Sequence, residues 1–196
     1  MTMQFERDHF DNAATLPMLV IVDPRSKHIG PDSGISRAAR AGIVAGCRAA
    51  LSLARLRGLA VAILRGEGTG SASDGNAGGW IKGFEPMRSD ILLERRGKSC
   101  YSSEYFDEIA QAAGGDIVLA GFAGEGGCLA TAADAISAGH RMTFLRDATY
   151  DKTSESFSES QLRLLGSFTK FDIRAATVSN WVSSLGVTLA LGGAHG

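Results

Sequence analysis

Cys128 and Asp23 are the two residues of this chain whose types and settings best suit covalent chemistry. Cys128 follows a glycine-rich turn that contains Gly124, Gly126 and Gly127, and it leads into an alanine-rich segment. A thiol at the start of a helix lies near a positive dipole end and free backbone amides, which favour the thiolate. The pattern therefore indicates a cysteine nucleophile whose turn amides face a developing oxyanion. The alternative is a small apolar residue buried where a helix begins.

Asp23 and Arg95 come directly after two other apolar runs and are the candidate partners of the thiol. Burial at the end of a strand would raise the pKa of Asp23 into the range of a general base. The simpler alternative is an ordinary turn residue before Pro24. Because the carboxyl ends of parallel strands meet at one edge of a sheet, we expect Asp23, Arg95 and Cys128 to converge there.

The other cysteines and the histidines are weaker candidates. Cys47 lies inside a long alanine-rich helical pattern and is expected in the core, whereas Cys100 precedes a predicted helix near the same edge and remains a second candidate nucleophile. No cysteine pair has the spacing of a disulfide framework or a zinc site, so neither a metal nor a cofactor is predicted. The four histidines, of which His28 follows Asp23 closely, are expected at the surface. They are His9, His28, His140 and His195. A general base is therefore sought among the carboxylates.

The apolar runs that must position these residues have the length of strands and are nearly continuous, which is typical of a sheet covered on both faces. They are residues 18–22, 59–64, 91–93, 117–120, 142–145 and 173–178. Helical patterns at 35–57, 102–112, 126–139 and 158–168 lie between several of them. This alternation predicts a parallel α/β fold.

Length and charge limit the function classes. The 196 residues fit a single domain, with a core expected from about residue 16 to residue 186. A net charge of −1 and scattered basic residues argue against nucleic acid as a partner. No apolar run approaches the roughly 20 residues that a membrane span needs, and the N-terminal residues lack a signal-peptide core. A cytoplasmic protein that binds a small molecule is therefore expected.

The stretch from Arg65 to Gly79 is rich in glycine, serine and asparagine and is too long for a tight turn. Loops of this length are often lids or disordered segments. The aromatic residues Trp80, Phe84 and Trp181 are candidates either for the core or for contacts between copies of the chain. A homo-oligomer is expected, without a prediction of its size.

The motifs around Asp23 and Cys128 resemble those of the isochorismatase-like cysteine hydrolases. In that family an aspartate ends the first strand, a lysine follows the third, and a cysteine lies in the turn after the fourth. The matching segments here are Leu19–Asp23, Asp116–Gly121, Cys128–Ala135, Gly139-His140 and Arg146–Ala148, and the resemblance extends from about Met18 to Leu185.

This resemblance implies a three-layer α/β/α, Rossmann-like fold with a six-stranded parallel sheet of order 3-2-1-4-5-6. It also implies hydrolysis of a small amide, ureido or related acyl compound through a covalent intermediate, with Asp23 as general base and Cys128 as nucleophile. Arg95 stands where the family has lysine, and Lys98 is the alternative cation. Arginine keeps the positive charge but cannot give up a proton.

Two further comparisons with the family narrow the prediction. The turn before Cys128 is one residue longer than usual, so its oxyanion geometry is not transferred from the family. Nicotinamidase-like members carry an aspartate and histidine metal cluster between the second and third strands, whereas residues 65–79 contain no histidine. That subfamily is disfavoured, and no metal is expected. Isochorismatase itself, amidases of carbamoyl or ureido substrates, and hydrolases of other small acyl compounds remain open.

Two other functions compete with a hydrolase. A Rossmann-type nucleotide-binding domain also uses a glycine turn between strand and helix, and Asp147 lies about 20 residues further on. However, the glycines between Gly121 and Cys128 do not form the GxGxxG pattern. The third possibility, motivated by Arg95, is a catalytically altered binding or scaffold member of the same fold.

Overall fold

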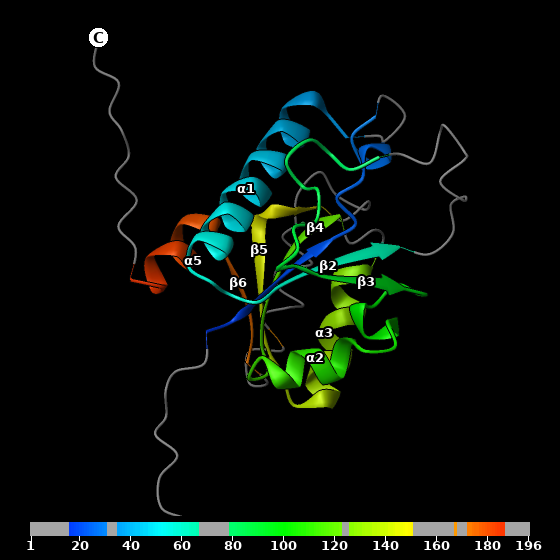
Figure 1. Ribbon diagram of the computed structural model, residues 1–196, viewed down its shortest axis with the longest axis vertical. Helices are drawn as coiled ribbons and strands as arrows, with labels where there is room; N and C mark the ends of the chain where they lie inside the picture. The colour runs from blue at the N-terminus through cyan, green and yellow to red at the C-terminus, as the bar shows by residue number, and fades with distance from the viewer. Residues whose placement is uncertain are drawn as a thin grey trace, which may run out of the picture.

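The computed structural model describes residues 16–30, 35–66, 79–122, 126–150 and 172–186, together with Ser167. These residues form a six-stranded parallel sheet of order β3-β2-β1-β4-β5-β6 (Figure 1), which confirms the predicted topology. The strands are β1 (Met18–Val22), β2 (Val61–Gly66), β3 (Ile91–Arg95), β4 (Asp116–Phe122), β5 (Arg141–Tyr150) and β6 (Ile173–Ala176).

Helices cover both faces of the sheet, as the continuous apolar strands predict. On one face lie α1 (Arg37–Leu56) and α5 (Val178–Ser184), and on the other lie α2 (Phe106–Ala112) and α3 (Gly127–Ala138) (Figure 1). Two short 3₁₀ helices, η1 (Ser26–His28) and η3 (Cys100–Ser102), follow β1 and β3. Each face has its own apolar core, so the fold is the three-layer α/β/α arrangement.

Helix α1 illustrates how the sequence forms these elements. The hydroxyl of Ser36 caps the helix by accepting a hydrogen bond from the amide of Ala39 at 3.2 Å. Its buried side chains recur at helical spacing and pack on the sheet. Cys47 belongs to this face, is fully buried, and its thiol donates to the carbonyl of Ala148 at 2.8 Å. The prediction that Cys47 is a core residue is thus confirmed.

Several predicted boundaries differ from the structure. The last strand ends at Ala176 instead of continuing to Val178, because Thr177 caps α5 by accepting from the amide of Asn180 at 3.1 Å. The pattern at 102–112 forms a helix only from Phe106, and a 3₁₀ turn precedes it. Apart from Ser167, the helix predicted at 158–168 lies outside the described residues.

The three aromatic residues for which core and contact between copies were both open lie in or against the core of this chain. Phe84 and Trp181 are both buried and belong to the core on the α1 face, and Trp80 is partly buried against the same core. Burial within one chain therefore places Phe84 and Trp181 in the core. In the described part of the chain, no helix is both long and apolar enough to cross a membrane.

Gly121 is required where β4 passes the end of β1. Its φ is +107°, and a Cβ at this position would lie 2.4 Å from the carbonyl oxygen of Val22 and 2.6 Å from its amide nitrogen. Backbone atoms of a central strand cannot move away cheaply. We therefore expect Gly121→Ala to lower the free energy of unfolding by roughly 3 kcal/mol or more, measured by urea denaturation.

Gly42→Ala is the matched control for this substitution. Gly42 lies on the exposed side of α1, where an added Cβ meets no atom within 4 Å. Alanine is preferred to glycine inside a helix by about 1 kcal/mol, so this variant should be at least as stable as the parent. Equal stability of the two variants would contradict the role assigned to Gly121.

Candidate active site

The predicted site residues lie at the edge of the sheet where the strands end. Asp23 follows β1, Gly66 and Arg95 end the neighbouring strands β2 and β3 and lie opposite each other, and Cys128 lies in the first turn of α3 after β4. The amide of Asp23 donates to the carbonyl of Leu64 at 2.7 Å, which fixes the end of β1 against β2. The sheet thus brings together the segments that carry these residues.

The backbone reverses direction at Asp23. Its φ is +44°, a left-handed conformation that aspartate adopts more readily than most residues with side chains. The amide of Arg25 donates to the carbonyl of Asp23 at 2.8 Å, and the carbonyl of Pro24 accepts from the amide of Ile81 at 2.9 Å. Arg25 also pairs with Trp80 in an isolated antiparallel bridge. This turn folds the residues after Asp23 back toward its own side chain.

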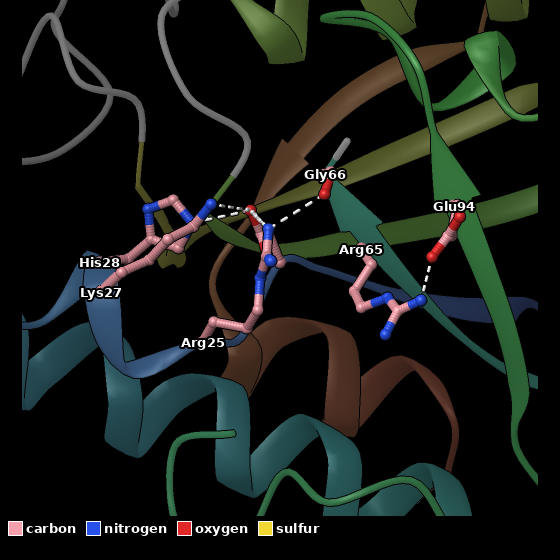
Figure 2. A network of polar contacts seen from close by, with 7 residues as sticks. Arg25, Lys27, His28, Arg65, Gly66 and Glu94 are labelled. Atoms are coloured by element: carbon pink, nitrogen blue, oxygen red, sulfur yellow. Dashed lines mark hydrogen bonds and ion pairs between the residues drawn. The ribbon is translucent and has the colours of Figure 1, made fainter. Parts of the chain in front are cut away.

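Three basic side chains surround the carboxylate of Asp23 (Figure 2). Nε of Arg25 donates to Oδ1 and its Nη2 donates to Oδ2 at 3.0 Å. Nε2 of His28 lies 2.8 Å from the same Oδ2, and Nζ of Lys27 lies 3.6 Å from it. We call Asp23, Arg25, Lys27 and His28 the Asp23 cluster.

Gly66 has no side chain, and the Asp23 cluster occupies the space where a side chain would lie. Its carbonyl accepts from Nη2 of Arg25 at 3.1 Å (Figure 2). A Cβ on Gly66 would lie 3.0 Å from Oδ2 of Asp23 and 3.5 Å from Nη2 of Arg25. Any larger residue would therefore press on the ion pair, so the glycine that ends β2 is part of the site's construction.

The expectation that the pKa of Asp23 lies in the range of a general base is wrong. Burial does raise it, but the hydrogen bonds and positive charges of His28 and Arg25 outweigh burial and hold the pKa well below its usual range. The side chain is almost completely buried, so these interactions act with little screening from water. Asp23 is therefore a stable anion and a weak acceptor of protons.

The cation in closest contact with Asp23 is Arg25, which the sequence reasoning missed. Arg95 is buried, and its Nη1 donates to the carbonyl of Lys98 at 2.5 Å and to that of Gly97 at 3.4 Å, so it anchors the loop after β3. Its Nε has no hydrogen-bond partner in the described structure. Lys98 itself is exposed. The sequence did contain a signal for this pairing, because three basic residues follow Asp23 within five positions.

Cys128 is fully buried at the start of α3, after Gly126, whose φ of +69° turns the chain into the helix. Thr131 Oγ1 accepts from the amide of Cys100 at 3.1 Å and donates to the carbonyl of Gly127 at 2.7 Å. This hydroxyl therefore ties η3 to the first turn of α3. Gly124 lies outside the described residues, whereas Gly126 and Gly127 are placed at the helix start as predicted.

The other two thiols are unsuited to nucleophilic attack. Burial raises the pKa of Cys100 to about 11, although its contact with Thr131 and the charge of Arg95 act in the opposite direction. Burial likewise raises the pKa of Cys47 to about 12. Because the thiolate is the reactive form, both side chains are unreactive near neutral pH. Cys128 is as buried as these two, and it remains the candidate nucleophile because of its position in the first turn of α3.

The histidines that the structure describes are not simple surface residues. His140 is buried, with Nδ1 2.8 Å from the hydroxyl of Tyr101 and Nε2 3.0 Å from Oε1 of Gln111, so the expectation of a surface position is wrong for it. His28 is partly exposed and contacts Asp23. His9 and His195 lie outside the described residues. No group of three metal-ligating side chains occurs among the residues described.

A hollow of about 200 Å³ lies at the opposite edge of the sheet and includes Trp181 in its lining. Its charged residues pair with one another, Arg141 with Asp116 at 3.3 Å and Arg174 with Asp172 at 3.1 Å. It contains none of the predicted site residues. We therefore place the candidate active site at the edge that carries the Asp23 cluster and Cys128.

The family model for the isochorismatase domain matches residues 17–170, which span the sheet from β1 to β5 and include Asp23 and Cys128. The chain belongs to the isochorismatase family. The resemblance inferred from the motifs is thus confirmed. Among curated proteins, none is significantly similar to the chain in sequence.

Several solved structures share this fold. An isochorismatase from Pseudomonas putida KT2440 is 22% identical with a TM-score of 0.67, covering 89% of this chain and 94% of that one. N-carbamoylsarcosine amidase from Thermoplasma acidophilum is 21% identical with a TM-score of 0.63, covering 83% and 96%. A cysteine hydrolase from Pseudomonas syringae pv. phaseolicola 1448A is 17% identical with a TM-score of 0.65, covering 87% and 92%. These likenesses establish the fold.

Proposed function

We propose that the chain is a cysteine hydrolase that cleaves a small amide, ureido or related acyl compound through a covalent intermediate on Cys128, without a metal ion. The observation that carries this proposal is the position of Cys128, in the first turn of α3 at the sheet edge that also holds the Asp23 cluster. Membership of the isochorismatase family supports hydrolysis as the reaction. The similarity to an amidase and to a cysteine hydrolase supports the bond type and the nucleophile.

The reaction would proceed in two steps. The thiol of Cys128 gives its proton to a basic group at this edge and attacks the acyl carbon as the thiolate, and the amide groups at the start of α3 stabilise the oxyanion. The same proton then passes to the nitrogen, and the amine leaves as the C–N bond breaks. Water then attacks the thioester, releasing the acid and the thiol. Arg95 would contribute positive charge near the site but no proton, because a guanidinium stays protonated. The substrate is a small molecule, and a homo-oligomer and a cytoplasmic location remain part of the proposal.

A catalytically altered binding member of the family is the second candidate. It is favoured by one observation, the ion pair in which Arg25 holds Asp23 as a stable anion. An aspartate held in this way is a poor general base. If no other group at this edge takes up the proton, the fold would bind a small acyl compound without turning it over.

The experiment that tests the proposal is mass spectrometry of the intact protein after exposure to a panel of small amides, ureides and activated esters. We expect at least one compound to add its acyl mass to the peptide that contains Cys128, and none to acylate Cys47 or Cys100. Release of the corresponding acid completes the evidence for hydrolysis. Acylation at a different residue, or binding without any adduct or turnover, would contradict the proposal, and the latter result would favour the binding protein.

A further inference from the structure

Arg95 is a buried cation that has no counter-ion among the described residues. It ends β3, and its exposed fraction is 8%. Asp23, which follows β1, pairs with Arg25. Glu94, which precedes Arg95, pairs with Arg65. Burial of an ionised group is unfavourable unless an opposite charge compensates it, and arginine does not avoid this cost by losing its proton. The buried guanidinium therefore favours an anion beside it.

The hydrogen bonds of Arg95 occupy one side of its guanidinium. Nη1 donates to the carbonyls of Lys98 and Gly97, at 2.5 and 3.4 Å. Nε is buried without a partner, and Nη2 makes no hydrogen bond within the part of the chain that the structure describes. The N–H groups of Nε and Nη2 are parallel and match the two oxygens of one carboxylate. Arg25 uses the same two atoms to bind Asp23.

Arg95 projects from the sheet on the same face as Cys128. Side chains alternate along a strand, so Arg95 shares its face with Leu93, which packs in the same apolar cluster as Cys128. Gly66 pairs with Arg95 in the sheet and faces the same way. A Cβ on Gly66 would lie 3.0 Å from Oδ2 of Asp23. The guanidinium therefore belongs to the side of the sheet edge where both Asp23 and Cys128 lie.

Hydrogen bonds also connect Arg95 with the start of α3. Nη1 holds the carbonyl of the residue two positions before Cys100. The amide of Cys100 donates to Oγ1 of Thr131 at 3.1 Å, and this hydroxyl donates to the carbonyl of Gly127 at 2.7 Å. Gly127 directly precedes Cys128. This network fixes the position of the guanidinium relative to the turn that carries the candidate nucleophile.

We propose that the substrate of this site carries a carboxylate, and that Nε and Nη2 of Arg95 bind it. This inference rests on the proposed function and narrows the substrate to amides, ureides or related acyl compounds that are anions at neutral pH. The carboxylate supplies the negative charge that the buried guanidinium lacks, and its two oxygens accept the two unbonded N–H groups. Arg95 thus binds and orients the substrate without transferring a proton. A neutral analogue leaves the guanidinium unpaired, so the site discriminates against it.

The test compares compounds that differ only in this charge. N-carbamoyl and N-acetyl amino acids and their C-terminal amides are matched pairs of this kind. Calorimetry gives their dissociation constants for Cys128→Ala, in which no acyl enzyme forms at this position, and for the same protein with a second substitution. We expect at least one carboxylate to bind about 10-fold or more tightly than its amide. Arg95→Met should abolish this preference, and Arg95→Lys should retain only part of it, because lysine keeps the charge but lacks the fork.

Arg65→Met is the matched control, because it removes a more exposed arginine from the neighbouring strand and should leave the preference unchanged. Urea unfolding curves establish that each variant is folded. Methionine has a similar length and carries no buried charge, so Arg95→Met is expected to fold. Should it fail to fold, the reduced preference expected for Arg95→Lys decides.

The outcomes separate this role from the proposed function. Equal binding of carboxylates and their amides, binding of neither, or a preference that persists without Arg95 would overturn the role of Arg95. Acylation of Cys128 in the parent protein by amides and carboxylates at equal rates would also overturn it, and would leave the hydrolase intact. A carboxylate preference that depends on Arg95, without any acylation of Cys128, would overturn the hydrolase and support Arg95 as the ligand contact of a binding protein.

Discussion

Replacing Cys128 by alanine is expected to lower kcat/KM at least about 1,000-fold for any amide or ureide that the parent protein hydrolyses, because the atom that forms the covalent intermediate is lost. The fold should persist. Cys128 is fully buried among apolar residues, and the loss of one sulfur atom from such a position typically costs about 1 kcal/mol of unfolding free energy. Steady-state kinetics, with a urea unfolding curve for the same preparation, measure both effects.

Cys100→Ala is the matched control for this prediction. It removes the same atom from the same apolar cluster, and Thr131 links the two segments that carry these cysteines. Because burial raises the pKa of Cys100 to about 11, its thiol stays protonated, and the variant should keep its activity within a few-fold of the parent. Full activity in Cys128→Ala, or a comparable loss in Cys100→Ala, would show that the nucleophile has been misassigned.

The second large effect is expected in stability, on replacing Asp23 by asparagine. Asp23 and Arg25 form a buried ion pair, and removing one partner of such a pair usually costs about 3 to 5 kcal/mol because the other charge is left uncompensated. Removing the carboxylate also leaves Lys27 and His28 facing Arg25 without an anion between them. Asp23→Asn should therefore be more destabilising than Arg25→Met, which leaves Asp23 with two basic neighbours. Urea denaturation of both variants and of the double variant measures the coupling.

Arg65→Met is the control for these variants, because it breaks an exposed salt bridge instead of a buried one. Arg65 pairs with Glu94 at the neighbouring strand ends (Figure 2), but the Glu94 side chain is 63% exposed. Exposed pairs contribute about 0 to 1 kcal/mol, so this variant should be close to the parent in stability. Similar losses in Arg65→Met and Arg25→Met would contradict the importance assigned to burial of the Asp23 pair.

The same ion pair predicts how stability depends on pH. The pKa of Asp23 is lower in the folded protein than in the unfolded chain, so the unfolded state binds the proton more readily. The stabilisation is therefore fully present above the unfolded pKa of roughly 4 and is lost as the pH falls from there toward the lower folded pKa. The difference in unfolding free energy between the parent and Asp23→Asn should shrink over this acidic range.

The fold could be predicted from sequence because its signals are local and repeated. Each central strand is a short run of apolar residues, and such runs require cover on both faces wherever they pair. The family motifs then supply the strand order, which the structure confirms. The boundaries that were predicted wrongly, such as the end of β6, depend on single capping contacts. The side chain of Thr177 makes such a contact, and a hydrophobic pattern does not predict it.

The candidate site, like the fold, could be predicted only in part from the sequence. The sequence alone determined that Asp23, Arg95 and Cys128 belong to segments ending at one edge of a parallel sheet, since strand direction and chain order follow from the pattern. Only the tertiary structure decided the partners of Asp23. They depend on its left-handed turn and on the space above Gly66, which together fold Arg25 and His28 onto the carboxylate. Burial alone raises the pKa of a carboxyl group, and the direction reverses once cations lie within hydrogen-bonding distance, so the charge state of Asp23 is a property of the folded contacts.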